Sequence, residues 1–153
     1  MARHAYPLEP VLRFRTLLSE QAMVRLSDLE RQRAELLRNR QQIEERQAAE
    51  RDALANVQAQ PTVDATEARR HQNVLEGLLH QTQQIQSQIA ALTADISAQR
   101  AELAQRRVEE ESLQVLKNRY LERVRASEER AEMLALEEAA MIRAARARYA
   151  NGS

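Results

Sequence analysis

Gln58-Ala59-Gln60-Pro61-Thr62-Val63-Asp64 is the one stretch in which a proline interrupts the interior of this 153-residue chain. Residues 11–60 contain neither Gly nor Pro, so a helix of about 50 residues can run up to this point. After Pro61, only Gly77 interrupts the helical pattern before Gly152. The stretch therefore separates two long segments that can each form a helix.

The same stretch contains signals for ending one helix and starting the next. Pro61 has no backbone N–H and must break the first helix. Asp64 can serve as the N-cap of the second helix, with Glu67 reaching back as the other half of a capping box. We expect a first helix at about residues 8–59, a turn at about 60–64 and a longer second helix at about 65–149.

The composition is that of helices. The sequence has 2 Gly, 3 Pro, 3 Tyr, 1 Phe and no Trp. These are too few turn residues and too few large aromatic side chains to build the turns and the core of a β-sandwich, a barrel or a wound α/β domain. The 23 Lys and Arg balance 23 Asp and Glu, so the charge favours neither nucleic acid nor an anionic membrane as a partner. The chain has no Cys, which excludes disulfides and thiolate chemistry. Because no apolar run approaches roughly 18 to 20 residues and the start lacks a signal-peptide core, we expect a soluble intracellular protein.

Seam positions in the second segment recur in steps of three and four residues. Fourteen of 22 such positions are apolar, and this alternation indicates a coiled-coil seam rather than the wider stripe of a globular helix. The positions are Leu75, Leu78, Thr82, Ile85, Ile89, Leu92, Ile96, Gln99, Leu103, Arg106, Glu110, Leu113, Lys117, Tyr120, Val124, Ser127, Ala131, Leu134, Glu138, Met141, Ala145 and Arg148.

The first segment repeats more loosely. Polar side chains at Arg33, Arg40 and Gln47 weaken its seam. Its remaining seam positions are Leu29, Leu36 and Ile43, continued by Glu50 and Val57, with Leu8, Leu12, Leu26 and Leu54 on the adjoining seam.

Two complementary helices joined by a short turn fold back most simply as an antiparallel hairpin. With the turn near Pro61, facing residue numbers should sum to about 123, which places Ile43 near His80. The prediction is an all-α protein, a single coiled-coil domain over residues 1–153 that forms a long two-helix antiparallel hairpin. About 30 residues of the longer second helix should extend beyond the first, leaving uncovered the seam positions Tyr120, Val124, Leu134 and Met141.

The sequence contains only weak signals for a catalytic or metal-binding site. His71 and His80 each have a Glu four residues earlier, a spacing that could hold a metal but is common on solvated helices. The clustered carboxylates at 109–111 and 128–129 have no concave pocket that would shift their pKa values. The sequence has no Gly-rich phosphate loop. We therefore expect no enzyme activity, no cofactor, no metal site and no small-molecule substrate.

Two features are not required in a simple spacer. Between Gln72 and Gln99 the only charged side chains are Glu76 and Asp95, whereas the whole chain is 30% charged. A neutral surface is easier to desolvate in a protein interface, although Gln is also an ordinary helix former on solvated surfaces. At the other end of the hairpin, residues 6–15 place the only Phe and four other apolar residues beside two Arg. Both stretches are candidate interaction surfaces.

The opening Tyr6-x-Leu8-x-x-Val11-Leu12-x-Phe14-Arg15 resembles the start of the flagellar export protein FliJ family, whose chains commonly begin with an aromatic-x-Leu-x-x-Val-Leu-x-x-Arg pattern. The downstream segment Glu110-Glu111-Ser112-Leu113-Gln114-Val115-Leu116-Lys117-Asn118-Arg119-Tyr120 looks like the Glu-rich, Leu-x-x-Leu-Lys segment of the same family. The resemblance covers essentially the full length. The scarcity of Lys and the weakened middle of the first helix depart from the family pattern.

This resemblance implies a non-enzymatic stalk and chaperone component of the flagellar type III protein export apparatus, similar to the central stalk subunit of rotary ATPases. The end that carries both termini would insert into the hexameric ring of the export ATPase, and the protein would also contact a membrane-embedded export-gate protein. Export chaperones are further implied partners. The protein alone would be a monomer in the cytoplasm, peripheral at the inner-membrane face. Stalk proteins of type III injectisomes share the shape, so the resemblance leaves both systems open.

The contacts with each partner are expected on different parts of the hairpin. Apolar and cationic residues at the open end are expected to contact the ATPase ring: Leu8, Val11, Leu12, Phe14, Arg15, Leu113, Leu116, Arg119, Tyr120, Arg123 and Val124. The neutral surface near the turn is expected to contact the export gate through Gln72, His80, Gln84 and Gln88. The alternative is a structural coiled-coil scaffold or tether that self-associates through the C-terminal overhang of the second helix.

Overall fold

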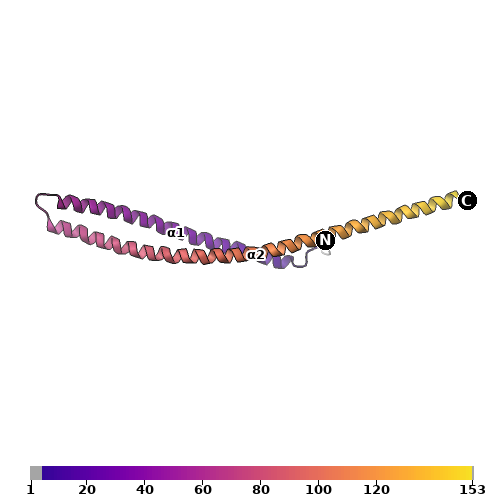
Figure 1. The fold of residues 1–153 in the computed structure, drawn as a ribbon, viewed down its shortest axis with the longest axis horizontal. Coiled ribbons are helices and arrows are strands. Elements are labelled where there is room, and N and C mark those ends of the chain that lie inside the picture. Colours follow the sequence, from indigo (N-terminus) through magenta and orange to yellow (C-terminus); the bar gives the residue numbers. More distant parts are fainter. Residues whose placement is uncertain (1–4, 153) are drawn as a thin grey trace. The chain divides into compact units, whose positions relative to one another are not determined.

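The structure, a computed structural model, describes residues 5–152 and consists of two helices joined by a turn (Figure 1). Helix α1 spans Glu9–Gln58 and has 50 residues, and helix α2 spans Ala65–Asn151 and has 87 residues. Residues 5–152 contain no strand. The prediction of an all-α hairpin whose second helix is the longer one is confirmed.

The chain groups into two compact units, and each contains part of both helices. The turn unit comprises Glu20–Gln105. The terminal unit comprises the described residues up to Ser19 together with those from Arg106 onward. The expectation of a single coiled-coil domain over residues 1–153 stays a prediction.

The start of α2 is capped by a side chain of the turn. Oδ1 of Asp64 accepts hydrogen bonds from the backbone N–H groups of Thr66 at 3.0 Å and Glu67 at 3.3 Å. These groups have no partner within the helix, so the cap stabilises its first turn. The carboxylate of Glu67 lies 3.9 Å from the guanidinium of Arg70. The Asp64 half of the predicted capping box is therefore present, while the Glu67 side chain faces a cation of its own helix.

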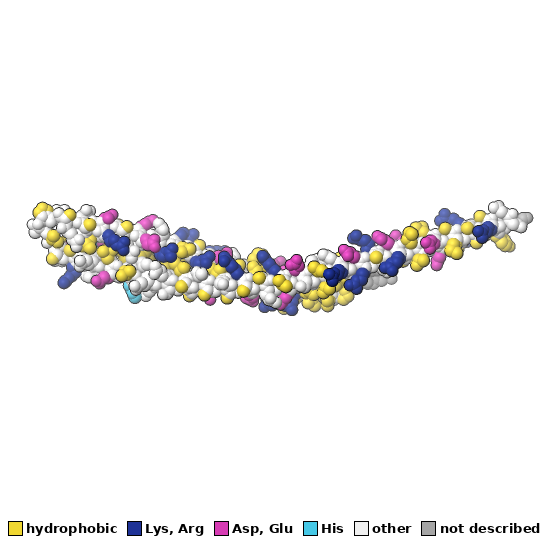
Figure 2. All heavy atoms as spheres, in the orientation of Figure 1, with side chains coloured by type: hydrophobic (Ala, Val, Ile, Leu, Met, Phe, Trp, Pro, Cys, Tyr) yellow, Lys and Arg dark blue, Asp and Glu magenta, His cyan; other side chains and the backbone are white. Residues whose placement is uncertain are grey.

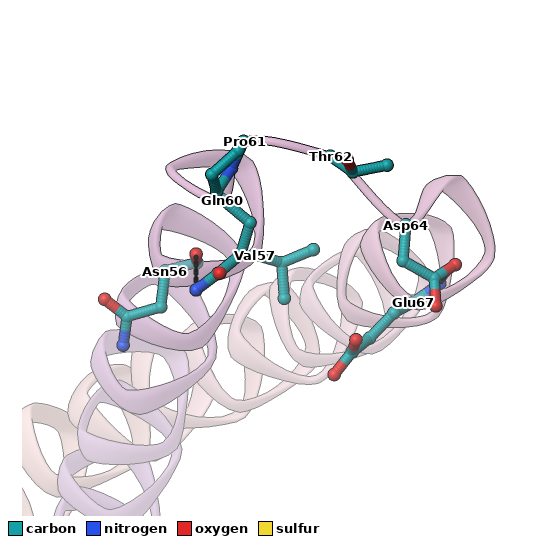
Figure 3. Close-up of a pocket in the computed structure, with 7 residues that line it drawn as sticks. All are labelled: Asn56, Val57, Gln60, Pro61, Thr62, Asp64 and Glu67. Carbon is teal, nitrogen blue, oxygen red and sulfur yellow. Dashed lines mark hydrogen bonds between the residues drawn. The ribbon is translucent and has the colours of Figure 1, made fainter.

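The end of α1 is capped by a residue that follows the helix. The side-chain amide of Gln60 donates a hydrogen bond to the backbone oxygen of Asn56 at 3.5 Å (Figure 3). Pro61 follows directly and has no N–H with which to continue the helix. An open hollow of about 490 Å³ lies between the two helix ends and is lined by Asn56, Val57, Gln60, Pro61, Thr62, Asp64 and Glu67.

In the turn unit the two helices pair in opposite directions. The backbone oxygen of Ala22 accepts a hydrogen bond from Gln99 at 3.3 Å, and Glu50 contacts His71 at 2.6 Å. The residue number on α2 falls as the number on α1 rises, which defines an antiparallel pair. The numbers of these two pairs sum to 121, and those of Gln47 with Thr82 sum to 129, so the sums lie on both sides of the predicted value of about 123. His80, the predicted neighbour of Ile43, is exposed and its side chain contacts Gln84; the pairing of these two positions stays a prediction.

The buried side chains of this unit follow the predicted three–four alternation. Ile96 is 1% exposed and is the most completely buried large side chain of the described chain. Burying a side chain of this size typically stabilises a fold by about 1.5 to 3 kcal/mol. Every seam position on α2 from Leu75 to Leu103 is buried or half-buried. The core is therefore a single seam between two helices.

A polar layer lies inside that seam. The amide of Gln47 donates to the hydroxyl of Thr82 at 3.2 Å, and this hydroxyl donates to the backbone oxygen of Leu78 at 3.0 Å. Gln47 and Thr82 are both buried. Because a buried polar group without a partner is costly, the pairing explains how a glutamine is tolerated at a seam position.

In the terminal unit, contacts between side chains join α1 and the segment before it to α2. Arg15 forms an ion pair with Glu109 at 2.7 Å, and the hydroxyl of Thr16 donates to Glu110 at 3.1 Å. Further contacts are an ion pair of Glu9 with Lys117 at 2.9 Å and a tilted ring pair of Tyr6 with Tyr120, whose centroids lie 5.6 Å apart. From Tyr6 to Arg15 the number of the contacted residue falls from 120 to 109, so the pairing is antiparallel here too.

Two expectations about this unit are wrong. Leu8 was placed on the seam by its spacing, but it precedes α1 and is 42% exposed, and the first buried leucine is Leu12 at 5%. Tyr120 was expected to be uncovered, but the ring of Tyr6 packs against it and it is half-buried. The turn before α1 therefore covers one more layer of α2 than the helix itself does.

Beyond Val124, the seam positions of α2 are exposed. Val124 is the last half-buried seam position, and Leu134 and Met141 are 60% and 71% exposed. Of residues 125–151, only Ala126 and Ala139 are not exposed.

Candidate interaction surfaces

The polar groups that could suggest chemistry are engaged in structural contacts. Nδ1 of His71 lies 2.6 Å from a carboxylate oxygen of Glu50, so its hydrogen-bonded carboxylate comes from the opposite helix and not from Glu67. His80 is exposed and contacts the side chain of Gln84 at 3.2 Å. Residues 5–152 contain no group of three or more His, Cys, Asp or Glu side chains that could hold a metal ion.

Neither helix, over the described residues, is sufficiently long and apolar to span a lipid bilayer.

The terminal unit exposes a group of large apolar side chains, which we call the terminal apolar surface. On and before α1 these are Leu8, Val11, Phe14 and Leu17, exposed by 42%, 42%, 55% and 48%. On α2 they are Val108, Val115 and Leu116, exposed by 59%, 42% and 44%. The α2 members line a shallow groove of about 450 Å³ together with Glu111, Ser112 and Arg119.

The predicted ring-contact residues fall into two groups. Leu8, Val11, Phe14, Leu116, Arg119 and Arg123 are exposed. The others hold the unit together: Leu12 is buried, Arg15 is paired with Glu109, Tyr120 packs on Tyr6, and Leu113 and Val124 are half-buried.

Leu17, Val108 and Val115 belong to the terminal apolar surface but were not predicted as contacts. They could have been found from the sequence, because all three are large apolar residues away from the three–four seam. On a solvated coiled-coil flank such positions are usually polar. An apolar residue there therefore indicates an exposed contact surface.

A second hollow lies beside the start of α1. It has a volume of about 820 Å³ and is lined by Ala5, Tyr6, Pro7, Glu9, Pro10, Arg13 and Tyr120. The hydrogen bond from Lys117 holds the pKa of Glu9 below its ordinary value of 4.5. A carboxylate that stays ionised to lower pH keeps this ion pair intact in mildly acidic solution.

The turn unit presents the predicted neutral surface. Gln72, His80, Gln84 and Gln88 are all exposed. Leu79 is 54% exposed within the same stretch, and it lines a hollow of about 190 Å³ with Gln47, Arg51, Leu75 and Glu76. Leu79 was not predicted as a contact, although it too lies off the seam. It adds an apolar side chain to a surface with few charges.

Comparison with known proteins gives one match over nearly the whole chain. The family model described as Flagellar FliJ protein matches residues 4–149. No curated protein and no solved structure matches the chain significantly.

Proposed function

Because the chain belongs to the flagellar FliJ family, we propose that it is a non-enzymatic stalk of the flagellar type III protein export apparatus, joining the export ATPase ring to the membrane export gate. Family membership supports an export-related role in the flagellum. The finer assignment rests on the presence, in two parts of one hairpin, of exposed surfaces with different chemistry.

The terminal apolar surface is proposed to contact the ATPase ring. Phe14 is 55% exposed, and Leu116 is 44% exposed on the other helix. Arg119 and Arg123 are exposed on α2 one and two turns further on. Aromatic and Arg side chains that become desolvated often carry most of the energy of a protein interface. This combination of exposed aromatic, aliphatic and cationic groups is the observation that carries the proposal.

The neutral surface of the turn unit is proposed to contact the export gate. From Gln72 to Gln99 only Glu76 and Asp95 are charged, so little charge must be desolvated when a partner covers it. Exposed Leu79 supplies apolar area within that stretch. The contact would involve Gln72, His80, Gln84 and Gln88.

A stalk of this kind would act by binding unequally to different states of the ring. A ligand shifts a conformational equilibrium only by its difference in affinity for the states, so unequal contacts around the ring would bias its assembly or its ATPase cycle. We place the protein in the cytoplasm, peripheral at the inner-membrane face. Export chaperones are further proposed partners.

The test measures the two activities separately. Phe14→Ala combined with Leu116→Ala should abolish stimulation of the cognate export ATPase and leave gate binding nearly unchanged. Gln84→Glu combined with Gln88→Glu should weaken gate binding and spare ATPase stimulation. These side chains are exposed, so circular dichroism should show full helicity for both variants.

The matched controls make the same kinds of substitution at exposed positions outside the two proposed contact surfaces. Val24→Ala removes an equally exposed apolar side chain of α1, 62% exposed, and Gln32→Glu adds a charge to an exposed position outside the neutral stretch. Both should behave as the unchanged protein. If the two double variants lost both activities together, or neither, the assignment of the two surfaces would be wrong.

A further inference from the structure

The last turn of α2 ends in an Asn–Gly pair that the proposed function does not use. Asn151 is the last residue of the helix and Gly152 follows it, and both are exposed. The chain contains five Asn, and Asn151 is the only one that a Gly follows. Because Gly has no side chain, its backbone nitrogen is open to approach by a neighbouring group. The pair has the features of a site of spontaneous chemical modification.

We propose that Asn151 is a deamidation site, at which water is the only co-reactant. The backbone nitrogen of Gly152 loses its proton and attacks Cγ of Asn151. A bond forms between these two atoms, the bond from Cγ to Nδ2 breaks, and the amide group takes up a proton and leaves as ammonia. Water then opens the five-membered imide at either of its two carbonyl carbons. One opening gives aspartate at position 151, and the other gives isoaspartate, in which the main chain continues through the side-chain carboxyl carbon.

A backbone hydrogen bond opposes this reaction in the folded chain. The N–H of Gly152 donates to the backbone oxygen of Arg148 at 2.9 Å, which holds the attacking nitrogen in the last turn of the helix. The ring can close only after this bond breaks and the backbone of Asn151 leaves its helical angles. Because helix ends open much more often than helix interiors, the reaction proceeds through fraying of this one turn.

The other four asparagines lie inside the helices. Each is followed by Arg or Val, whose side chain crowds the nitrogen that would have to attack. The N–H of that next residue also belongs to a helical segment, in which backbone hydrogen bonds run without interruption. These asparagines are Asn39, Asn56, Asn73 and Asn118. Sequence and structure together therefore select one asparagine of the five.

Conversion would change both the charge and the stability of this helix end. Residues 139–152 contain three Arg and no acidic residue, and Figure 2 shows basic side chains near the C-terminal end of α2. The new carboxylate would be the first acidic side chain of this stretch and would make the formal net charge of the chain more negative by one. Since the unpaired carbonyl groups at a helix C-terminus carry partial negative charge, a carboxylate there destabilises the last turn.

This inference goes beyond the proposed stalk function and does not depend on it. The modification is measured on the protein alone, without the export ATPase or the gate. Its presence or absence therefore says nothing about whether the ATPase is stimulated.

Mass spectrometry of the full chain after incubation in mildly alkaline solution tests the site. Trypsin cleaves after Arg148 and releases a peptide that begins at Tyr149 and contains Asn151. We expect this peptide to gain the mass that exchange of an amide NH₂ for OH produces, and to separate into an aspartate and an isoaspartate form. The peptides that contain the other four asparagines should stay unchanged.

A synthetic peptide of residues 149–153 gives the rate without the helix. We expect the full chain to convert more slowly than this peptide. No mass gain at Asn151 while the synthetic peptide is fully converted would overturn the proposal, as would equal gains at the other asparagines. A full chain that converts as fast as the peptide would overturn the protective role of the hydrogen bond.

Gly152→Ala tests the attack by the backbone nitrogen. It should lose most of the conversion that the unchanged protein shows in the same time, because a side chain now crowds that nitrogen. A Cβ at this position would lie 3.1 Å from the backbone oxygen of Arg148, a tight contact that loosens the turn. Loosening alone would speed the reaction, so slower conversion identifies the loss of Gly as the cause. Conversion at the unchanged rate or faster would overturn this mechanism.

Ala147→Gly tests the role of helix opening. It lowers the helix propensity of the last turns without changing the Asn–Gly pair, so conversion should be faster. Ala131→Gly is the matched control, because it makes the same substitution at an exposed position of α2 far from the pair, and it should leave the rate unchanged. Equal rates for Ala147→Gly and the unchanged protein, or equal acceleration by both variants, would overturn the role of the last turn.

Discussion

Glu9 and Lys117 form an ion pair between the two helices of the terminal unit, with 2.9 Å between Oε2 and Nζ. Lys117 is the only lysine of the chain. Its hydrogen bond is the main reason that the pKa of Glu9 is lowered from 4.5. A specific and partly shielded pair at the start of α1 thus joins residues that are more than a hundred positions apart.

The Glu9–Lys117 pair should make stability depend on pH in one direction. Because the pKa of Glu9 is lower in the folded than in the unfolded chain, its contribution is complete above pH 4.5 and is lost as the pH falls through the lowered value. Lys117→Gln should lower the melting temperature at pH 7, and the difference should disappear in more acidic solution. Circular dichroism melts from pH 7 down to about pH 2.5 measure this. Lys117→Arg should retain most of the effect, and a difference that stayed constant with pH would contradict the explanation.

The buried Gln47–Thr82 layer should respond differently to single and double substitutions. Gln47→Ala removes the donor to a buried hydroxyl, and we expect a loss of about 1 to 3 kcal/mol in the free energy of unfolding. Gln47→Leu together with Thr82→Val replaces both partners with apolar groups and should be nearly neutral or stabilising. Urea unfolding monitored by helicity gives both values. A double variant less stable than Gln47→Ala would show that the polar layer itself is favourable.

Ile96 should be the most sensitive apolar position of the turn unit. It is 1% exposed, and Ile→Ala at a buried site typically costs about 2 to 5 kcal/mol. We expect the lower part of this range, because a seam between two helices can collapse into the space or admit water. Leu79→Ala is the matched control, since Leu79 is 54% exposed on the same helix. Equal losses from the two substitutions in urea unfolding would argue against this seam.

Asp64 should stabilise the start of α2 through its two backbone hydrogen bonds. Asp64→Ala removes both acceptors, and loss of an N-cap typically costs about 0.5 to 2 kcal/mol. Asp64→Asn keeps an acceptor oxygen and should lose much less. Hydrogen exchange of the amides of Thr66 and Glu67 provides a local readout. Faster exchange in Asp64→Ala and near-normal exchange in Asp64→Asn are expected, and equal protection in all three proteins would exclude a role for the cap.

Many of the exposed residues in the candidate contact surfaces could be predicted from the sequence, because they lie at positions outside the seam. Gln72, Gln84 and Gln88 were predicted to be exposed contacts, and they are exposed in the structure. Leu12 was also nominated as a contact, yet it is 5% exposed. Leu12 belongs to the N-terminal motif, which suggested a contact with a partner, but it also lies on the seam of the first helix, which predicts burial. The seam position determines where the side chain lies.

The two helices and the seam of α2 through Val124 could be read from the sequence by itself. Gly and Pro placement and the three–four alternation are local properties, because they depend on the backbone chemistry of single residues and on the period of one helix. Even the antiparallel pairing followed from the short turn at Pro61, since so few residues cannot carry the chain back for a parallel pair.

Only the tertiary structure decided which side chains meet across that seam. Tyr6 packs on Tyr120, His71 contacts Glu50, and Gln47 bonds Thr82. These contacts depend on the register and rotation of one helix against the other, and a shift of a single turn would exchange every partner. Periodicity in one segment specifies which face is buried, but the residue opposite each position is set by the packing of both helices together.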